Sequence, residues 1–136
     1  YAGLNFVDAS AAATGEIIYR LICLMGCDPD SKICESLLVA IADEISSLLP
    51  VNGLVLVAGL GNMDITPDAL GPKVSSKVLA TRHITGEIAR STGLDKLRPV
   101  AVLATGVTGQ TGIETGEHLL SVAKRIKPSA IIVIDV

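Results

Sequence analysis

Two aspartates each follow an apolar segment that has the composition of a buried strand. Asp68 ends the segment LVLVAGLGNMDITPD at residues 54–68, and Asp135 ends the segment IIVID at residues 131–135. Ligands of open α/β sheets bind beyond the carboxyl ends of the strands. If these two strands are neighbours, the carboxylates can approach each other, so that one keeps a proton while the other ionises. Such a pair could activate water for peptide hydrolysis or hold a metal ion.

Local helix chemistry gives a simpler interpretation of Asp68. Thr66 is a candidate N-cap, and Pro67 suits the first position of a helix, where its missing N–H is not needed. Asp68 would then lie in the first helical turn, where the helix dipole favours a negative charge. The residues alone leave both interpretations open.

A second loop of interest is the glycine-rich segment TGVTGQTGIETGE at residues 105–117. Its glycines allow tight turns, and Thr111 with Glu114 has the spacing of a helix capping box. Glycine-rich loops before helices can also bind phosphate. This loop has neither a P-loop pattern nor a dinucleotide-binding GxGxxG pattern, so the capping box is the favoured interpretation.

The histidines and cysteines do not form a recognisable ligand set. His83 follows Arg82 in a polar stretch and is expected on the surface, and His118 is expected on a helix face. Cys23, Cys27 and Cys34 fall in helical sequence without a CxxC pair. We expect them to be reduced and at least partly buried. We expect no metal ion and no other cofactor.

The pattern of apolar residues predicts a single α/β domain over residues 1–136. Hydrophobic residues make up 49% of the 136 residues and aromatic residues only 2%, a composition that suits strands covered on both faces. We predict a three-layer α/β/α fold with a four-stranded, mainly parallel sheet and right-handed crossovers. The predicted strands are residues 4–8, 53–61, 98–105 and 129–136. The predicted helices are residues 9–26, 31–49, 67 to about 80, and 113–127, while residues 82–97 stay ambiguous.

Composition also argues against several partners. The net charge is −3 without a basic stripe, so no nucleic-acid surface is expected. No apolar run approaches the roughly 20 residues of a membrane span, and no signal peptide is recognised, so we expect a cytoplasmic protein. A homo-oligomer stays possible.

Residues 44–136 resemble the germination proteases of spore-forming bacteria. The matching sequence segments are GLGNMDITPDALGPKV, LATRHI, RPVAVLATGVTGQTGIETGE and IKPSAIIVID. The resemblance implies a fold shared with the hydrogenase maturation proteases and an aspartic-type endopeptidase that degrades small acid-soluble spore proteins in the spore core. It implies that Asp68 and Asp135 are the catalytic pair.

Residues 1–43 are similar instead to a segment of the DHH-family phosphoesterases. Neither the DHH motif nor the later Asp-Thr-Gly motif of that family is present, so no metal ligand is transferred and phosphodiester cleavage is weakly supported. The two resemblances together predict an engineered chimera, joined in the helix near residues 30–45, that folds but does not cleave spore proteins. The alternative is an endopeptidase that acts on those proteins through Asp68 and Asp135.

Overall fold

The computed structural model describes residues 42–93 and 97–135 of the chain. The chain divides into two compact units, Tyr1–Pro50 and Val51–Val136. Residues 42–48 of the first unit are helical, in agreement with the end of the helix predicted over 31–49. Because the two units are described separately, the single domain expected over the whole chain stays a prediction.

Several expectations lie outside the described residues. They concern the strand at 4–8, the helix at 9–26, and the burial and redox state of Cys23, Cys27 and Cys34. Within the described part of the chain, no helix is long and apolar enough to cross a membrane.

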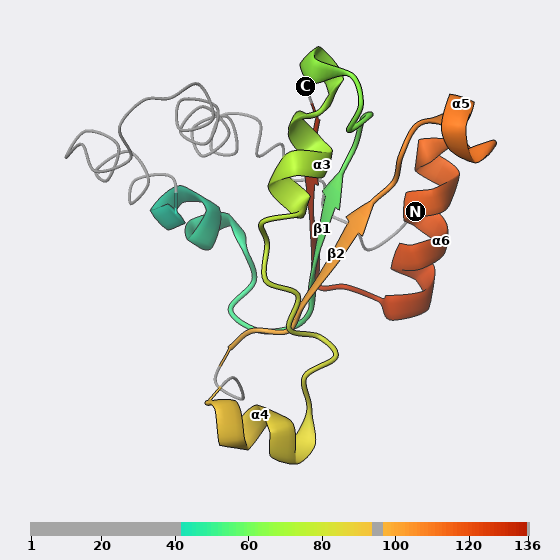
Figure 1. The fold of residues 1–136 in the computed structure, drawn as a ribbon. Helices are drawn as coiled ribbons and strands as arrows, with labels where there is room; N and C mark the ends of the chain where they lie inside the picture. Colours follow the sequence, from blue (N-terminus) through green and yellow to red (C-terminus); the bar gives the residue numbers. More distant parts are fainter. Residues whose placement is uncertain (1–41, 94–96, 136) are drawn as a thin grey trace. The chain divides into compact units, whose positions relative to one another are not determined.

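The second unit is built on a parallel three-stranded sheet with β1 in the centre (Figure 1). Its strands are β1 (Val55–Gly59), β2 (Val100–Ala104) and β3 (Ala130–Ile134), in the order β2-β1-β3. Every residue of β1 is buried, which explains why that strand carries an unbroken apolar sequence. The parallel α/β sheet predicted from the sequence is confirmed. The described residues form three strands rather than four, and the remaining predicted strand is the one at 4–8.

The helices of this unit are shorter than the sequence pattern predicts. They are the 3-10 turn η1 (Thr66–Asp68), α3 (Leu70–Ser75), α4 (Gly86–Thr92), α5 (Thr108–Thr111) and α6 (Thr115–Ile126). The helix predicted from 67 to about 80 is therefore divided into η1 and α3. The ambiguous stretch 82–97 contains α4, and the predicted loop before α6 contains α5. Only α6 closely matches its predicted range, 113–127.

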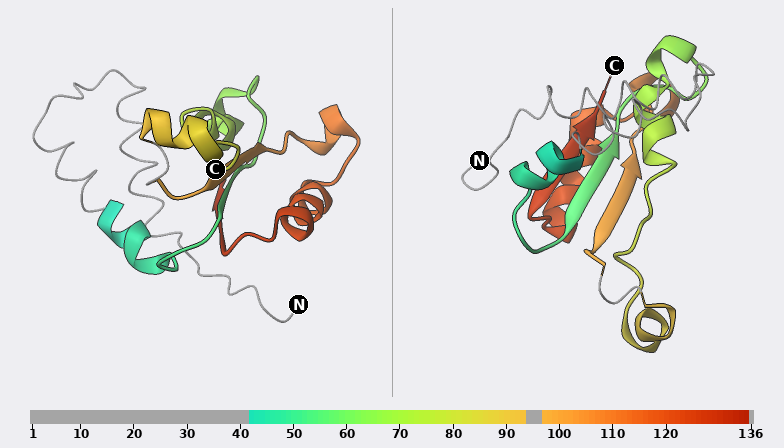
Figure 2. Two further views of the ribbon diagram at one scale, coloured as in Figure 1. Left: turned by 90° about the horizontal axis from the view of Figure 1, so that it is seen from below. Right: turned by 90° about the vertical axis from the view of Figure 1, so that its left-hand side faces the viewer.

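The carboxyl ends of the strands all point the same way, and the loop containing η1 lies beyond them, whereas α4 lies beyond the opposite ends (Figure 1). Helix α3 contacts all three strands and buries four of its residues. Helix α6 runs alongside the strands in Figures 1 and 2, but Ala123 is its only buried residue. The predicted three-layer arrangement is therefore not confirmed.

The start of α3 lies directly against the sheet because two glycines face each other. A side chain on Gly59 of β1 would overlap the backbone of Gly71 and the hydroxyl of Ser75. A side chain on Gly71 would meet the carbonyl oxygen of Ile134 at 2.5 Å and the amide nitrogen of Leu60 at 2.6 Å. Both neighbours are backbone atoms of the sheet, which cannot rotate away as a flexible side chain does.

This close approach predicts that Gly71→Ala is strongly destabilising. We expect the free energy of unfolding to fall by about 1–3 kcal/mol, because the added methyl group forces α3 away from the sheet. Urea unfolding followed by circular dichroism would measure the change.

Gly116→Ala in α6 is the matched control, since nothing lies within 4 Å of an added methyl group there. That variant should be unchanged or more stable by up to about 1 kcal/mol. Equal stability of the two variants would contradict the proposed close packing.

Candidate active site

The loop between β1 and α3 folds back on itself and fixes Asp68 at two points. The backbone N–H of Asn62 donates to the backbone carbonyl oxygen of Asp68 at 2.9 Å and to its carboxylate Oδ2 at 2.8 Å. In a continuous helix that carbonyl would accept from residue 72, four positions later. Pro72 has no N–H to donate, so the carbonyl of Asp68 is available to Asn62. One donor thus holds both the backbone and the side chain of the aspartate.

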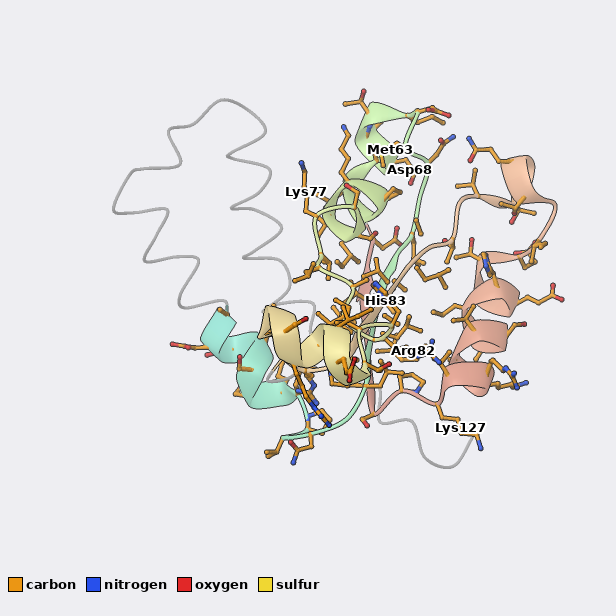
Figure 3. All side chains as sticks on the ribbon, turned by 60° about the horizontal axis from the view of Figure 1, so that its bottom comes forward. Met63, Asp68, Lys77, Arg82, His83 and Lys127 are labelled. Carbon is orange, nitrogen blue, oxygen red and sulfur yellow. The ribbon has the colours of Figure 1, made fainter. Side chains whose placement is uncertain are left out.

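Gly61 makes this arrangement possible. Its φ is 113°, a conformation that residues with side chains rarely adopt. A side chain at this position would overlap the backbone carbonyl oxygen of Asp68 and would lie 3.0 Å from its Oδ1. Because Gly61 has no side chain, the half-buried Asp68 can lie directly against it. Figure 3 shows Asp68 beside Met63 of the same loop.

Asp135 follows the strand that pairs with β1. Strands β1 and β3 are in parallel register from Val55 opposite Ala130 to Gly59 opposite Ile134. The ladder continues one step further, because the N–H of Leu60 donates to the carbonyl oxygen of Ile134 at 2.8 Å. Asp135, which is exposed, therefore comes directly after the end of β3 at the edge of the sheet where the Asp68 loop begins. A catalytic role for the two aspartates stays a prediction.

A second loop reaches the Asp68 loop through an amide side chain. Gln110 of α5 donates from Nε2 to Asn62 Oδ1 at 3.1 Å and to Asp64 Oδ2 at 3.4 Å. Asn62 Oδ1 also accepts the backbone N–H of Asp64 at 3.0 Å. Asn62 is buried, with 9% of its surface exposed. The segments that follow β1 and β2 are therefore joined by hydrogen bonds at the carboxyl edge of the sheet.

Sequence reasoning did not identify Asn62 or Gln110 as site residues. A signal was available, because both follow the carboxyl ends of neighbouring strands, where the strand-end rule expects ligands. That rule selects loops and not single residues. The contact between these two amides joins positions 48 residues apart, so no local pattern marks either of them.

The predicted helix caps are not present. Thr66 is the first residue of η1 and not its N-cap, which is Ile65. Asp68 lies in the first turn of η1, as predicted, but η1 is separate from α3, which begins at Leu70. Its carboxylate accepts the backbone N–H of Asn62 instead. The capping box is also wrong, because Thr111 ends α5 and its hydroxyl accepts the N–H of Ile113 at 3.2 Å. Glu114 stands at the N-cap position of α6 but its side chain makes no cap hydrogen bond.

The histidines lie in different surroundings. The N–H groups of Thr81 and Arg82 donate to the carbonyl oxygen of Val100 at the start of β2, which places His83 near the amino edge of the sheet. His83 is exposed and lies well away from Asp68 (Figure 3). His118 is half-buried on α6, with Nδ1 3.3 Å from the carbonyl oxygen of Thr105. Within 42–93 and 97–135, no three His, Cys, Asp or Glu side chains gather in a way that could hold a metal ion.

Comparison with known proteins identifies one family. A family model described as germination protease matches residues 26–136. The germination protease of Clostridium acetobutylicum is 44% identical over 111 residues, which cover 78% of this chain and 34% of that protein. The germination protease of Caldanaerobacter subterraneus is 44% identical over 108 residues, with 78% and 33% covered. That of Priestia megaterium is 45% identical over 87 residues, with 64% and 23% covered. The chain thus spans about a third or less of the length of these relatives.

These matches overturn the prediction of a non-catalytic chimera. The expected junction near residues 30–45 falls inside the continuous match over 26–136. Nothing in the comparisons supports a phosphoesterase segment. The resemblance of the first residues to that family rested on a helix start rich in small residues, a feature that many unrelated helices share.

The role of Gly61 yields a prediction for Gly61→Ala. We expect the added methyl group to displace Asp68 and break its hydrogen bonds with the backbone N–H of Asn62. Hydrogen exchange of that amide, followed by NMR, should accelerate by about tenfold or more, the loss of roughly one net hydrogen bond.

Gly112→Ala is the matched control for this experiment. Gly112 also has a positive φ, 68°, but nothing lies within 4 Å of an added methyl group. The control should lose about 1–2 kcal/mol of stability through backbone strain alone. In this control, hydrogen exchange of the Asn62 backbone amide should accelerate by no more than the loss of global stability explains. Unchanged exchange in Gly61→Ala would show that Asp68 does not depend on this close approach.

Proposed function

We propose that this chain, which belongs to the germination protease family, hydrolyses peptide bonds with Asp68 and Asp135 as its catalytic pair. The observation that carries the proposal is the pairing of β1 with β3. It brings the residue after β3 to the edge of the sheet from which the Asp68 loop departs. Because the chain spans about a third of the length of its curated relatives, its activity and its substrate are both part of this proposal.

The proposed reaction uses the two carboxyl groups in opposite protonation states. The ionised group accepts a proton from a water molecule as the water oxygen attacks the carbonyl carbon of the peptide bond. The protonated group gives its proton to the carbonyl oxygen, and a tetrahedral intermediate forms. The intermediate collapses when the C–N bond breaks and the leaving amine takes up a proton. The carboxyl groups exchange protons during the cycle, so neither is assigned permanently to one role.

The surroundings of Asp68 suit this chemistry. Oδ2 is already held by the backbone N–H of Asn62, so the carboxylate has a fixed orientation before any substrate arrives. Oδ1 lies on the side of Gly61, where any side chain would crowd the carboxylate. A catalytic group that is positioned in advance does not have to be ordered during the reaction.

The proposed substrates are small acid-soluble spore proteins, the substrates implied by the resemblance to germination proteases. The proposed location is the spore core. The three-layer α/β/α arrangement of the family fold forms part of the same proposal, with α3 and α6 on opposite faces of the sheet. It follows from the strand order, because the crossovers β1 to β2 and β2 to β3 run in opposite directions and both are expected to be right-handed.

We predict that Asp68→Asn and Asp135→Asn each abolish proteolysis. The rate of cleavage of a purified small acid-soluble spore protein, followed by gel electrophoresis, should fall by about 10²–10⁴-fold, since each substitution removes a proton-transfer group. Glu117→Gln is the matched control, because it neutralises an exposed carboxylate on α6. It should cleave at the rate of the unmodified chain. Undiminished cleavage by either aspartate variant, or no cleavage by the unmodified chain, would refute the proposal.

A further inference from the structure

We propose that Asn62 is a further catalytic residue of this site: its side-chain amide, oriented by Gln110, donates a hydrogen bond to the carbonyl oxygen of the peptide bond under attack. The inference rests on the proposed function, because it assigns a role in the same reaction. It concerns a group that stabilises charge and does not itself transfer a proton.

The orientation of the Asn62 amide is fixed by its neighbours. Its Oδ1 accepts the backbone N–H of Asp64 at 3.0 Å, and a backbone N–H can only donate. The oxygen of the amide must therefore face Asp64, and the opposite assignment would set two donors against each other. The second hydrogen bond to Oδ1, from Gln110 Nε2 at 3.1 Å, occupies its remaining acceptor position. The amide nitrogen Nδ2 consequently lies on the other side of the group.

The orientation of Gln110 is fixed in the same way. Its Nε2 lies between two oxygens, Asn62 Oδ1 at 3.1 Å and Asp64 Oδ2 at 3.4 Å. Rotating this amide by 180° would place oxygen against oxygen at both contacts. Gln110 therefore uses both of its N–H bonds to hold the Asn62 loop, and the three side chains form one hydrogen-bonded arrangement.

This arrangement leaves Nδ2 of Asn62 as an uncommitted donor. Among residues 42–93 and 97–135, no group accepts a hydrogen bond from it. The same residues contain no fully buried side-chain nitrogen or oxygen without a hydrogen-bond partner. Nδ2 is therefore not fully buried, although Asn62 as a whole is only 9% exposed. A mostly buried amide with one accessible donor is suited to bind an acceptor from a ligand.

The residue that carries this donor belongs to the proposed site. The backbone N–H of Asn62 lies 2.8 Å from Oδ2 of Asp68, so the residue that carries the amide also holds the carboxylate. As the water oxygen bonds to the carbonyl carbon, the electron pair of the C=O bond moves onto oxygen. A donor already fixed beside that oxygen stabilises the charge without reorganisation. The proton that the oxygen finally receives comes from the protonated aspartate, and Nδ2 keeps both of its hydrogens.

Kinetics of three variants test the role of the amide. Asn62→Asp keeps the oxygen that faces Asp64 and Gln110 but replaces the donor, and Asn62→Ala removes the whole amide without adding a charge. For both we expect kcat to fall by about 10²–10³-fold with little change in KM. Gln110→Ala keeps the Nδ2 donor of Asn62 but removes the side chain that orients it, and kcat should fall by about tenfold or less. Thr108→Ala, an exposed change in the same short helix, is the control and should leave kcat unchanged.

Comparison with the aspartate variants separates the two proposals. If Asp68→Asn and Asp135→Asn lose activity while Asn62→Ala and Asn62→Asp keep kcat, this inference is overturned and the proposed function stands. If the aspartate variants keep activity, it is the proposed function that fails.

A binding measurement tests the contact without turnover. The Asp68→Asn variant, labelled with ¹⁵N, is titrated with an intact small acid-soluble spore protein. We expect the side-chain amide resonance of Asn62 to shift at saturation, and the unchanged dispersion of the other resonances reports that the variant is folded. The Gln110→Ala substitution in the same background should reduce the shift. A saturated complex in which the Asn62 side-chain resonance does not move would overturn the inference.

Discussion

The close contact between the backbones of Gly59 and Gly71 determines how the carboxyl edge of the sheet is organised. A carbon added to Gly59 would overlap the backbone of Gly71, and one added to Gly71 would overlap the backbones of Leu60 and Ile134. Helix α3 can therefore begin directly on the end of β1, where the hydroxyl of Ser75 donates to the carbonyl oxygen of Gly71 at 2.6 Å. The intervening loop has both of its ends fixed, and it must turn back across the end of the sheet. Asp68 is carried on the returning part of that loop.

In the returning loop, hydrogen bonds from Asn62 to Asp68 take the place of regular helical hydrogen bonds. Pro72 removes the donor that would otherwise bind the carbonyl of Asp68, and Asn62 supplies its N–H instead. The same Asn62 is joined to Gln110 through its side chain. A residue with both a backbone and a side-chain amide thus connects the aspartate to the next loop of the sheet. The packing of Gly59 against Gly71 fixes the ends of the loop, and the hydrogen bonds of Asn62 fix Asp68 within it.

The sequence predicted those features that depend on local periodicity. The apolar run of residues 54–60 indicated a strand covered on both faces, and β1 is buried throughout. The helical pattern over 113–127 agrees closely with α6. The strand-end rule also selected the loops that carry Asp68 and Gln110, which lie at the carboxyl edge of the sheet, while the role of Asp135 stays a prediction. These predictions need only the spacing of residues within one segment.

The errors arose where distant partners decide the local structure. Thr66 and Thr111 both occur in patterns that favour helix caps, yet neither caps a helix. Asp68 is bound by a backbone N–H of the preceding loop, and Asn62 by a side chain from another element. The boundaries of α3 and the hydrogen bonds of the two amides follow from such contacts, which the linear pattern does not show.

The bridge between Asn62 and Gln110 also has a consequence for how the site assembles, because it joins segments that are distant in the sequence. Asp68 can be fixed by contacts within its own loop, but Gln110 lies 48 positions after Asn62 and reaches it when β2 has joined β1. Asp135 arrives later still along the chain, with β3. Contacts between distant segments form slowly, because the chain loses entropy before they are made. If Asp68 and Asp135 are the catalytic pair, a partly folded chain in which β3 has not yet joined the sheet lacks the complete site and cannot cleave other copies of itself.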